Sequence, residues 1–202
     1  MAALMQYTPL MPRLRPILAL AICALALALS LPPLRFLIEQ SMLWHMAIQM
    51  PLLVLGGWLA MRVLTDRLVP GLAQSMVRWN RYGLTGFIAA QAILAYWMLP
   101  LAIDRAIVLP LADGQKLVTL LLCGALLQHS FARSPAALQL FFVGYTVTMM
   151  TWLGFYFIST DLRLCNAYSL ASQVNTGRAL VAWGLVLGAA WLWAALRQRQ
   201  RD

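Results

Sequence analysis

Charged side chains are scarce in this chain: Asp, Glu, Lys and Arg make up 10% of its residues, whereas soluble globular proteins carry about 25%. Acidic residues are rarer than basic ones, with six Asp and Glu in total, and there are only two histidines. Hydrophobic residues make up 62% of the chain. This balance excludes an ordinary water-soluble globule and indicates an all-α protein whose helices cross a membrane.

The chain also lacks a polar stretch long enough for a separate soluble core, because the longest ones, 65–83 and 159–178, have only about 20 residues. We therefore expect a single domain, residues 1–202, built as a polytopic helical bundle. An apolar run of about 20 residues crosses the ~30 Å of hydrocarbon in a bilayer. The apolar runs predict about six transmembrane helices: Ile17–Leu34, Met42–Leu64, Leu84–Ile103, Lys116–Phe131, Ala136–Ile158 and Ala179–Leu196.

Basic residues are distributed unevenly between the two sides of these runs. With the N-terminus in the cytoplasm, ten of the fifteen Lys and Arg residues fall on the inner side and five on the outer side. Cytoplasmic loops of membrane proteins carry such an excess of positive charge. The pattern predicts a multi-pass protein of a bacterial inner (cytoplasmic) membrane with both termini cytoplasmic. Topology and contact with anionic lipid explain the net charge of +9, so no nucleic-acid partner is expected.

Several kinds of catalytic pattern are missing. The three cysteines, Cys23, Cys123 and Cys165, are too scattered for a disulfide framework or a zinc site. The sequence has no P-loop, nucleophile elbow or HExxH spacing. No acid or lysine lies at the centre of a predicted span, which argues against an ion-coupled transporter. We therefore expect a protein that is not an enzyme.

Candidate metal ligands are concentrated at the start of the second predicted span. Met42, His45, Met46, Gln49 and Met50 recur at i, i+3, i+4, i+7 and i+8 and would share one face of an α-helix. Thioether and imidazole groups suit Cu(I) better than the hard cations that prefer oxygen. The alternative is packing, because methionine commonly fills apolar interfaces and an intramembrane histidine is often only a hydrogen-bonded packing residue.

The two histidines, His45 and His129, raise the question of a bis-histidine haem. In the predicted topology His45 lies near the outer face and His129 near the inner end of the fourth run. At a rise of ~1.5 Å per residue, the two would be about 20 Å apart. One haem cannot bind both, so we do not expect a haem.

Three sequence elements resemble those of the CtaG-type cytochrome c oxidase assembly factors. Residues Trp44–Gly56 (WHMAIQMPLLVLG) are similar to the family's HMxxHM…PLLxLG element. Residues Trp97–Ile107 are similar to its WHLP…DxAL element, and Tyr168–Gly177 to its Tyr…DQxxxG element. The order and spacing of all three agree over roughly residues 41–185. The resemblance implies a membrane protein that supplies copper to a respiratory oxidase, or to another copper-dependent membrane complex, from the outer face.

The chain departs from the family pattern at several positions. Gln49 stands where the family has a second histidine, Met98 stands in the element that reads WHLP in the family, and Ser172 replaces an aspartate. Lys116-Leu117 replaces a Glu-His pair. The residues left to bind Cu(I) are His45, Met46, Met50 and Met98. The sequence leaves one alternative open: a non-catalytic accessory or structural subunit of a larger membrane complex that binds no metal.

Overall fold

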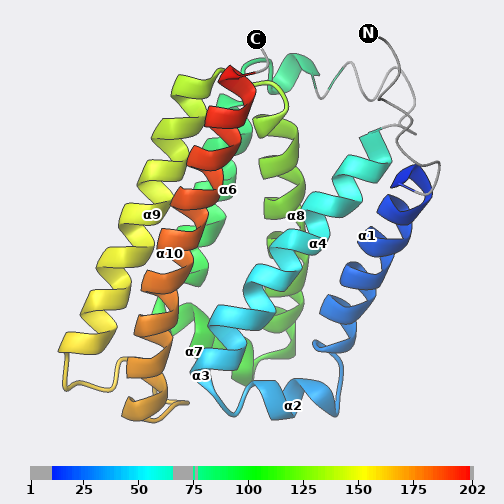
Figure 1. The fold of residues 1–202 in the computed structure, drawn as a ribbon. Helices are drawn as coiled ribbons and strands as arrows, with labels where there is room; N and C mark the ends of the chain where they lie inside the picture. Colours follow the sequence, from blue (N-terminus) through cyan, green and yellow to red (C-terminus); the bar gives the residue numbers. More distant parts are fainter. Residues whose placement is uncertain (1–10, 66–74, 76, 201–202) are drawn as a thin grey trace, which may run out of the picture.

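The structure, a computed structural model, describes residues 11–65, 75 and 77–200. These ranges are largely helical and contain no β-strand, which confirms the all-α class (Figure 1). The elements are α1 (Met11–Ala28), α2 (Leu34–Ile38), α3 (Met42–Trp44), the π-helix η1 (His45–Gln49), α4 (Met50–Thr65), α6 (Leu84–Trp97), α7 (Pro100–Val108), α8 (Pro110–Phe131), α9 (Ala136–Ser159) and α10 (Leu170–Arg199).

The long helices run up and down beside one another, and the short helices α2 and α7 lie at one end of the bundle (Figure 1). We call this end the site end, and we call the other, where α1 begins and α10 ends, the far end. Within the described ranges, four helical stretches are long and apolar enough to cross a membrane, and the bent pair α6–α7 makes a fifth. Helix α1 packs along α4. The chain is thus a membrane protein built as a helical bundle.

The third predicted run, Leu84–Ile103, is not one straight span. Helix α6 ends at Trp97, α7 begins at Pro100, and the two are bent by 73°. A proline disfavours the α conformation in the residue before it, and Leu99 is extended with φ −75° and ψ 128°. The prediction of a continuous helix was wrong because hydropathy does not register this break. The bend lets α7 pack against α8 at the site end.

Three further boundaries differ clearly from the sequence prediction: helix α10 begins at Leu170 and not at Ala179, and the ends of two other helices also differ. Helix α1 ends at Ala28 and not at Leu34, since a proline removes a helical hydrogen bond and Pro32 and Pro33 follow. Helix α8 begins at Pro110 and not at Lys116, with proline at the first helical position, where the missing N–H needs no partner. As a result, the residues between Pro110 and Lys116 project from a helix and not from a loop.

Two glycines allow α4 and α8 to approach closely. A Cβ atom added at Gly57 would overlap the backbone carbonyl of Leu121, and one added at Gly124 would overlap that of Val54. Small residues at helix contacts are the usual means by which membrane helices pack. These two helices form the centre of one lobe of the bundle, which α1 and α6 complete.

Helices α9 and α10 form the second lobe, a helical hairpin. Gly154 and Gly177 face each other across it, since a Cβ on Gly154 would lie 2.7 Å from the Gly177 carbonyl oxygen. The hairpin packs on the first lobe at the site end through α3 and η1. Nearer the far end, Phe87 of α6 stacks on Phe142 of α9 with ring centroids 4.7 Å apart.

We predict that Gly57→Ala lowers the free energy of unfolding by about 1–3 kcal/mol, the usual cost of overpacking a core. The new methyl group meets backbone, which cannot move without shifting α8. Gly114→Ala is the matched control on α8, because nothing lies within 4 Å of a Cβ built there, and alanine favours a helix over glycine. Thermal unfolding in detergent, followed by circular dichroism, measures both. Equal melting temperatures for Gly57→Ala and the wild type would contradict the close approach.

Candidate functional site

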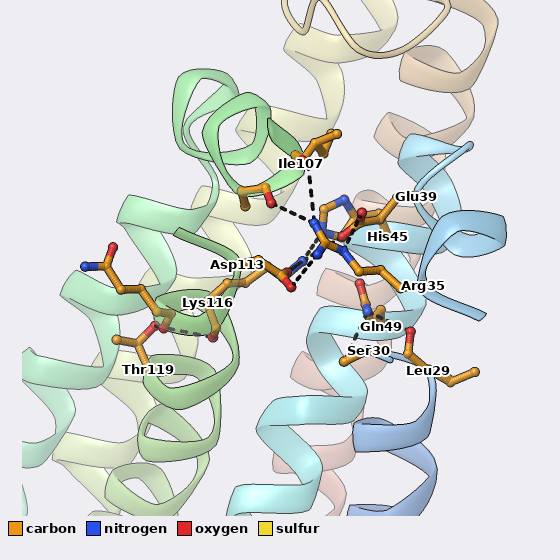
Figure 2. A network of polar contacts seen from close by, with 12 residues as sticks. Leu29, Ser30, Arg35, Glu39, His45, Gln49, Ile107, Asp113, Lys116 and Thr119 are labelled. Atoms are coloured by element: carbon orange, nitrogen blue, oxygen red, sulfur yellow. Dashed lines mark hydrogen bonds and ion pairs between the residues drawn. The ribbon is translucent and has the colours of Figure 1, made fainter. Parts of the chain in front are cut away.

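Four charged side chains form a closed ring of ion pairs at the site end, partly visible in Figure 2. Arg35 Nε lies 2.8 Å from Glu39 Oε2, and Arg35 Nη1 lies 3.0 Å from Asp113 Oδ2. Lys116 Nζ closes the ring at 3.2 Å from Glu39 Oε1 and 2.8 Å from Asp113 Oδ1. The Lys116 side chain is 0% exposed and the other three are 14% exposed or less. Two cations balance two carboxylates, which offsets the cost of taking these charges out of water.

Two of the four ion pairs each form within one short stretch of chain, and the other two join these stretches. Arg35 and Glu39 are one turn apart at α2, and Asp113 and Lys116 are one turn apart at the start of α8. Helix α7 contributes carbonyl oxygens from its C-terminal end, which accept from Arg35 Nη2 at 3.1 and 3.4 Å. The C-terminus of a helix carries partial negative charge and favours a cation. The bend before α7 therefore helps to place the guanidinium.

His45 is fully buried against this ring, and both of its ring nitrogens have partners. Nε2 lies 2.9 Å from Lys116 Nζ, and Nδ1 lies 2.6 Å from Tyr168 Oη. An ammonium group can only donate, so Nε2 accepts and the imidazole proton is on Nδ1, which donates to the Tyr168 oxygen. This tautomer is assigned from the hydrogen-bond network. In this arrangement His45 has no nitrogen lone pair left for a metal.

The helix changes from α to π geometry at His45. Residues 45–49 form a π-helix, in which the N–H of Met50 donates to the His45 carbonyl. Pro51 has no N–H, so the Ala47 carbonyl lacks its usual helical partner, and Trp183 Nε1 of α10 donates to it at 2.9 Å. Single π-helical turns are rare and often occur at functional sites.

The residues expected to share one face of the second span lie in two different environments. The regular α-helical spacing that defined it does not hold across η1. His45 and Gln49 face polar groups: the Gln49 amide donates to the Leu29 carbonyl and to Ser30 Oγ at the end of α1, as Figure 2 shows. Met46 and Met50 instead belong to the apolar core.

Three of the four expected copper ligands line one cavity. Met46, Met50 and Met98 lie in the wall of an apolar cavity of about 730 Å³ between α4, α6, α8, α9 and α10, and His45 is not among its lining residues. The structure thus places the three methionines among the residues that line this cavity and the His45 imidazole against Lys116. In the part of the chain that the structure describes, no group of three or more His, Cys, Asp or Glu residues is suited to a metal ion. Copper binding by the four residues stays a prediction.

The loop between α9 and α10 covers the site end. Asp104 of α7 holds this loop by accepting from the backbone N–H of Asn166 at 3.1 Å. Gln173 of α10 holds the same loop by two hydrogen bonds to its backbone. Its Oε1 accepts from the Leu164 N–H at 2.9 Å, and its Nε2 donates to the Leu162 carbonyl at 3.1 Å. Asp104 and Gln173 belong to the second and third elements that carry the family resemblance.

The three elements of the resemblance therefore meet at one place. The first supplies His45, the second supplies Asp104, and the third supplies Tyr168, which is buried and bonded to His45. Burial, together with the nearby charge of Glu39, raises the pKa of the Tyr168 phenol, so that it stays protonated at neutral pH. Ser172 at the start of α10 accepts the backbone N–H of Met42 at 2.9 Å, which ties the third element to the first.

The three cysteines are free, as the sequence predicted. Cys165 lies in the covering loop but is buried, with 1% of its surface exposed. Burial, followed by the charge of Asp104, raises the pKa of its thiol to about 12. Since the thiolate is the reactive form, Cys165 is unreactive at neutral pH.

Sequence reasoning missed the ion-pair ring because it placed Arg35, Glu39 and Asp113 in outer loops and Lys116 at the outer end of the fourth predicted run. A signal was present in their spacing: Arg35 and Glu39 are separated by four residues, and Asp113 and Lys116 by three. Opposite charges at these spacings share one face of a helix. In a chain with only six acidic residues, two such pairs beside apolar runs indicate buried ion pairs.

His129 lies at the far end and has its own polar partners. Its Nδ1 is 3.0 Å from Asn80 Nδ2, and its Nε2 accepts from Arg133 Nε at 3.0 Å. Thirteen residues of α8 separate His129 from Lys116, which contacts His45, and at ~1.5 Å per residue this is about 20 Å. The geometry agrees with the separation of the two histidines predicted from the sequence. His129 is buried at this end of α8.

Comparisons with protein-family models, with curated proteins and with solved structures find no match to this chain. The resemblance to the CtaG-type assembly factors stays a prediction that rests on the three elements described above.

We predict that Lys116→Met lowers the free energy of unfolding by about 3–5 kcal/mol, because it leaves buried carboxylates without one of their cations. The double variant Lys116→Met/Glu39→Gln removes one charge of each sign and restores neutrality, so it should regain much of this loss. The measurement is the unfolding midpoint of the purified protein in one detergent. A Lys116→Met midpoint equal to that of the wild type, or a double variant less stable than the single one, would contradict the ring as described.

Proposed function

We propose that this chain is an accessory or assembly protein of a respiratory oxidase, or of another copper-dependent membrane complex, and that it carries out no reaction itself. One observation supports this proposal: the three elements that resemble the CtaG-type family meet at one site. His45 of the first element bonds to Tyr168 of the third, and Asp104 of the second holds the loop that carries Tyr168.

The chemistry of the site favours a structural role for His45. The Lys116 ammonium stands among His45 Nε2, Glu39 Oε1 and Asp113 Oδ1. A lysine of the chain itself thus supplies the positive charge that a bound cation would supply among such groups. On this proposal the ring fixes the surface at the site end, and that surface docks on the partner complex.

Copper handling is the second candidate, and the presence of three methionines in the lining of one cavity favours it. Met46, Met50 and Met98 line the same cavity, and thioether ligands select Cu(I). These three residues would hold the ion and deliver it from the site end. In this version His45 orients η1 and does not bind the metal.

We propose that the protein lies in a bacterial inner membrane with both termini cytoplasmic, so that the site end faces outward. The excess of Arg and Lys predicted for the far end supports this orientation.

We predict that a membrane-impermeant maleimide labels Leu162→Cys in intact spheroplasts, because Leu162 is 69% exposed in the covering loop. The wild type should remain unlabelled, since Cys165 is buried with a pKa raised to about 12. Tyr82→Cys, at a position 61% exposed near the far end, is the matched control and should react only after permeabilisation. The opposite pattern for the two variants would reverse the orientation.

We predict that deletion of the gene lowers the activity of the partner oxidase, and the copper response separates the two candidates. An accessory protein predicts loss of oxidase subunits from the membrane with no rescue by added copper. Copper handling predicts an assembled oxidase short of copper, partly rescued by copper in the medium. Elemental analysis and haem spectra of the membranes measure both.

Complementation of the deletion strain with Met98→Leu sharpens this test. The variant keeps an apolar side chain of similar volume but removes one sulfur, so the accessory role predicts full activity and copper handling predicts a lower copper content. Normal oxidase in the deletion strain would contradict both candidates.

A further inference from the structure

The surface of the site end is of two kinds. The covering loop between α9 and α10 exposes charged and polar side chains, which include Asp161, Arg163 and Asn166. The short helices α2 and α7 instead expose large apolar side chains: Leu34, Phe36 and Leu37 on α2, and Leu101 and Val108 on α7. Apolar side chains gathered on a surface mark contact with a membrane or with another protein.

Helix α7 is largely apolar on two opposite faces. Its buried face consists of Ala102, Ile103 and Ala106, which belong to the apolar core. Its exposed face consists of Leu101, Arg105 and Val108, which follow one another at i, i+4 and i+7. An arginine beside apolar side chains suits the membrane surface, because its aliphatic stem lies along apolar groups while its guanidinium reaches the headgroups.

The directions of the two short helices suit a position in the plane of the membrane. Helix α7 is bent by 73° from α6, so it runs across the bundle and not along it. Helix α2 lies across the same end of the bundle (Figure 1). With nine and five residues, neither approaches the ~20 residues that a transmembrane helix needs.

Exposed Trp and Tyr side chains mark the level of the membrane surface at the site end. Trp44 of α3, Tyr96 of α6, and Trp152 and Tyr156 of α9 are all exposed and lie within about two turns of the helix ends there. Such side chains are enriched where a membrane meets water, because each has an apolar ring and a polar N–H or O–H group. Tyr96 lies just before α7 and Trp44 shortly after α2, so both short helices begin or end at this level.

The exposed surface of α8 continues the apolar surface of α7 toward the far end. Helix α8 is long and apolar enough to cross a membrane. Leu111, Val118 and Leu122 are exposed at i, i+7 and i+11 and share one of its faces. Gln115 lies on the same face and lines a shallow groove with Tyr96, at the level that the aromatic side chains mark. The lipid-facing surface of this span therefore reaches α7.

We propose that α2 and α7 lie at the boundary between the headgroups and the acyl chains of the leaflet at the site end, and that this lipid covers their exposed apolar faces. The covering loop is then the part of the site end that stands in water. The inference rests on the membrane-spanning helices and not on the proposed function. If the proposed function also holds, the covering loop is the surface left for the partner complex.

The test uses the purified full-length protein in nanodiscs of phosphatidylglycerol and phosphatidylethanolamine, where no partner protein is present. Phe36→Cys, Val108→Cys and Leu162→Cys place a thiol at positions that are 61%, 75% and 69% exposed. A membrane-impermeant maleimide should modify Leu162→Cys on the order of tenfold faster than the other two, because a thiol in lipid is shielded from the reagent and from ionisation. Equal rates for the three variants would overturn the proposal.

Two controls accompany this measurement. The wild-type protein gives the background from Cys23, Cys123 and Cys165, and labelling after denaturation in sodium dodecyl sulfate shows that every introduced thiol is intact. Native membranes separate lipid from a protein partner. Slow labelling of Val108→Cys in both nanodiscs and native membranes supports lipid, whereas fast labelling in nanodiscs with slow labelling in native membranes would show that a protein covers α7 and would overturn the proposal.

Nitroxide labels at the same three positions measure depth directly by electron paramagnetic resonance. Oxygen concentrates in the hydrocarbon, whereas a water-soluble nickel chelate stays outside it. Labels on Phe36→Cys and Val108→Cys should collide more often with oxygen and less often with the chelate than the label on Leu162→Cys, with all three variants folded by circular dichroism. The same collision ratio at the three positions would place α2 and α7 in water, outside the bilayer.

Discussion

The buried Lys116 ammonium is the interaction on which the site end of the bundle depends. It contacts Glu39 after α2, Asp113 on α8 and His45 at η1. A carboxylate left without a cation at this depth would cost several kcal/mol, so these three elements must keep their relative positions. Because His45 in turn bonds to Tyr168, the same constraint extends to the loop that covers the site.

The class of fold could be predicted from the sequence because span length and apolar content are local properties. The starts of the second and fifth runs, at Met42 and Ala136, coincide with helix starts in the structure. The break at Pro100 was missed, because a window that averages hydropathy does not register a residue's effect on the backbone of its neighbour. The early start of α8 was missed because Asp113 is charged and Pro110 and Gly114 are not typical of a helix interior, so this stretch was assigned to a loop.

The candidate site was predictable only in part, for a different reason. His45 was found from the spacing of Met and His residues, the elements that contain Asp104 and Tyr168 were found from the family resemblance, and the structure brings these elements together. The partner of His45 was not found, because Lys116 is 71 residues away in the chain and its role depends on tertiary structure. His45 contacts Lys116 and Tyr168 whereas Met46 and Met50 lie in the apolar core, a difference set by which other helices pack on each side and not by spacing along one helix.

The ion-pair ring also has a consequence for biosynthesis. It consists of two pairs, each made within one short segment and each neutral by itself: Arg35 with Glu39, and Asp113 with Lys116. Glu39 is synthesised 77 residues before Lys116, so the first pair reaches the membrane before the second pair exists. During this interval each carboxylate has a cation one helical turn away. The ring then forms when the two pairs meet and add the contacts of Arg35 with Asp113 and of Lys116 with Glu39, while both original pairs are kept. No uncompensated charge therefore has to enter the hydrocarbon during insertion.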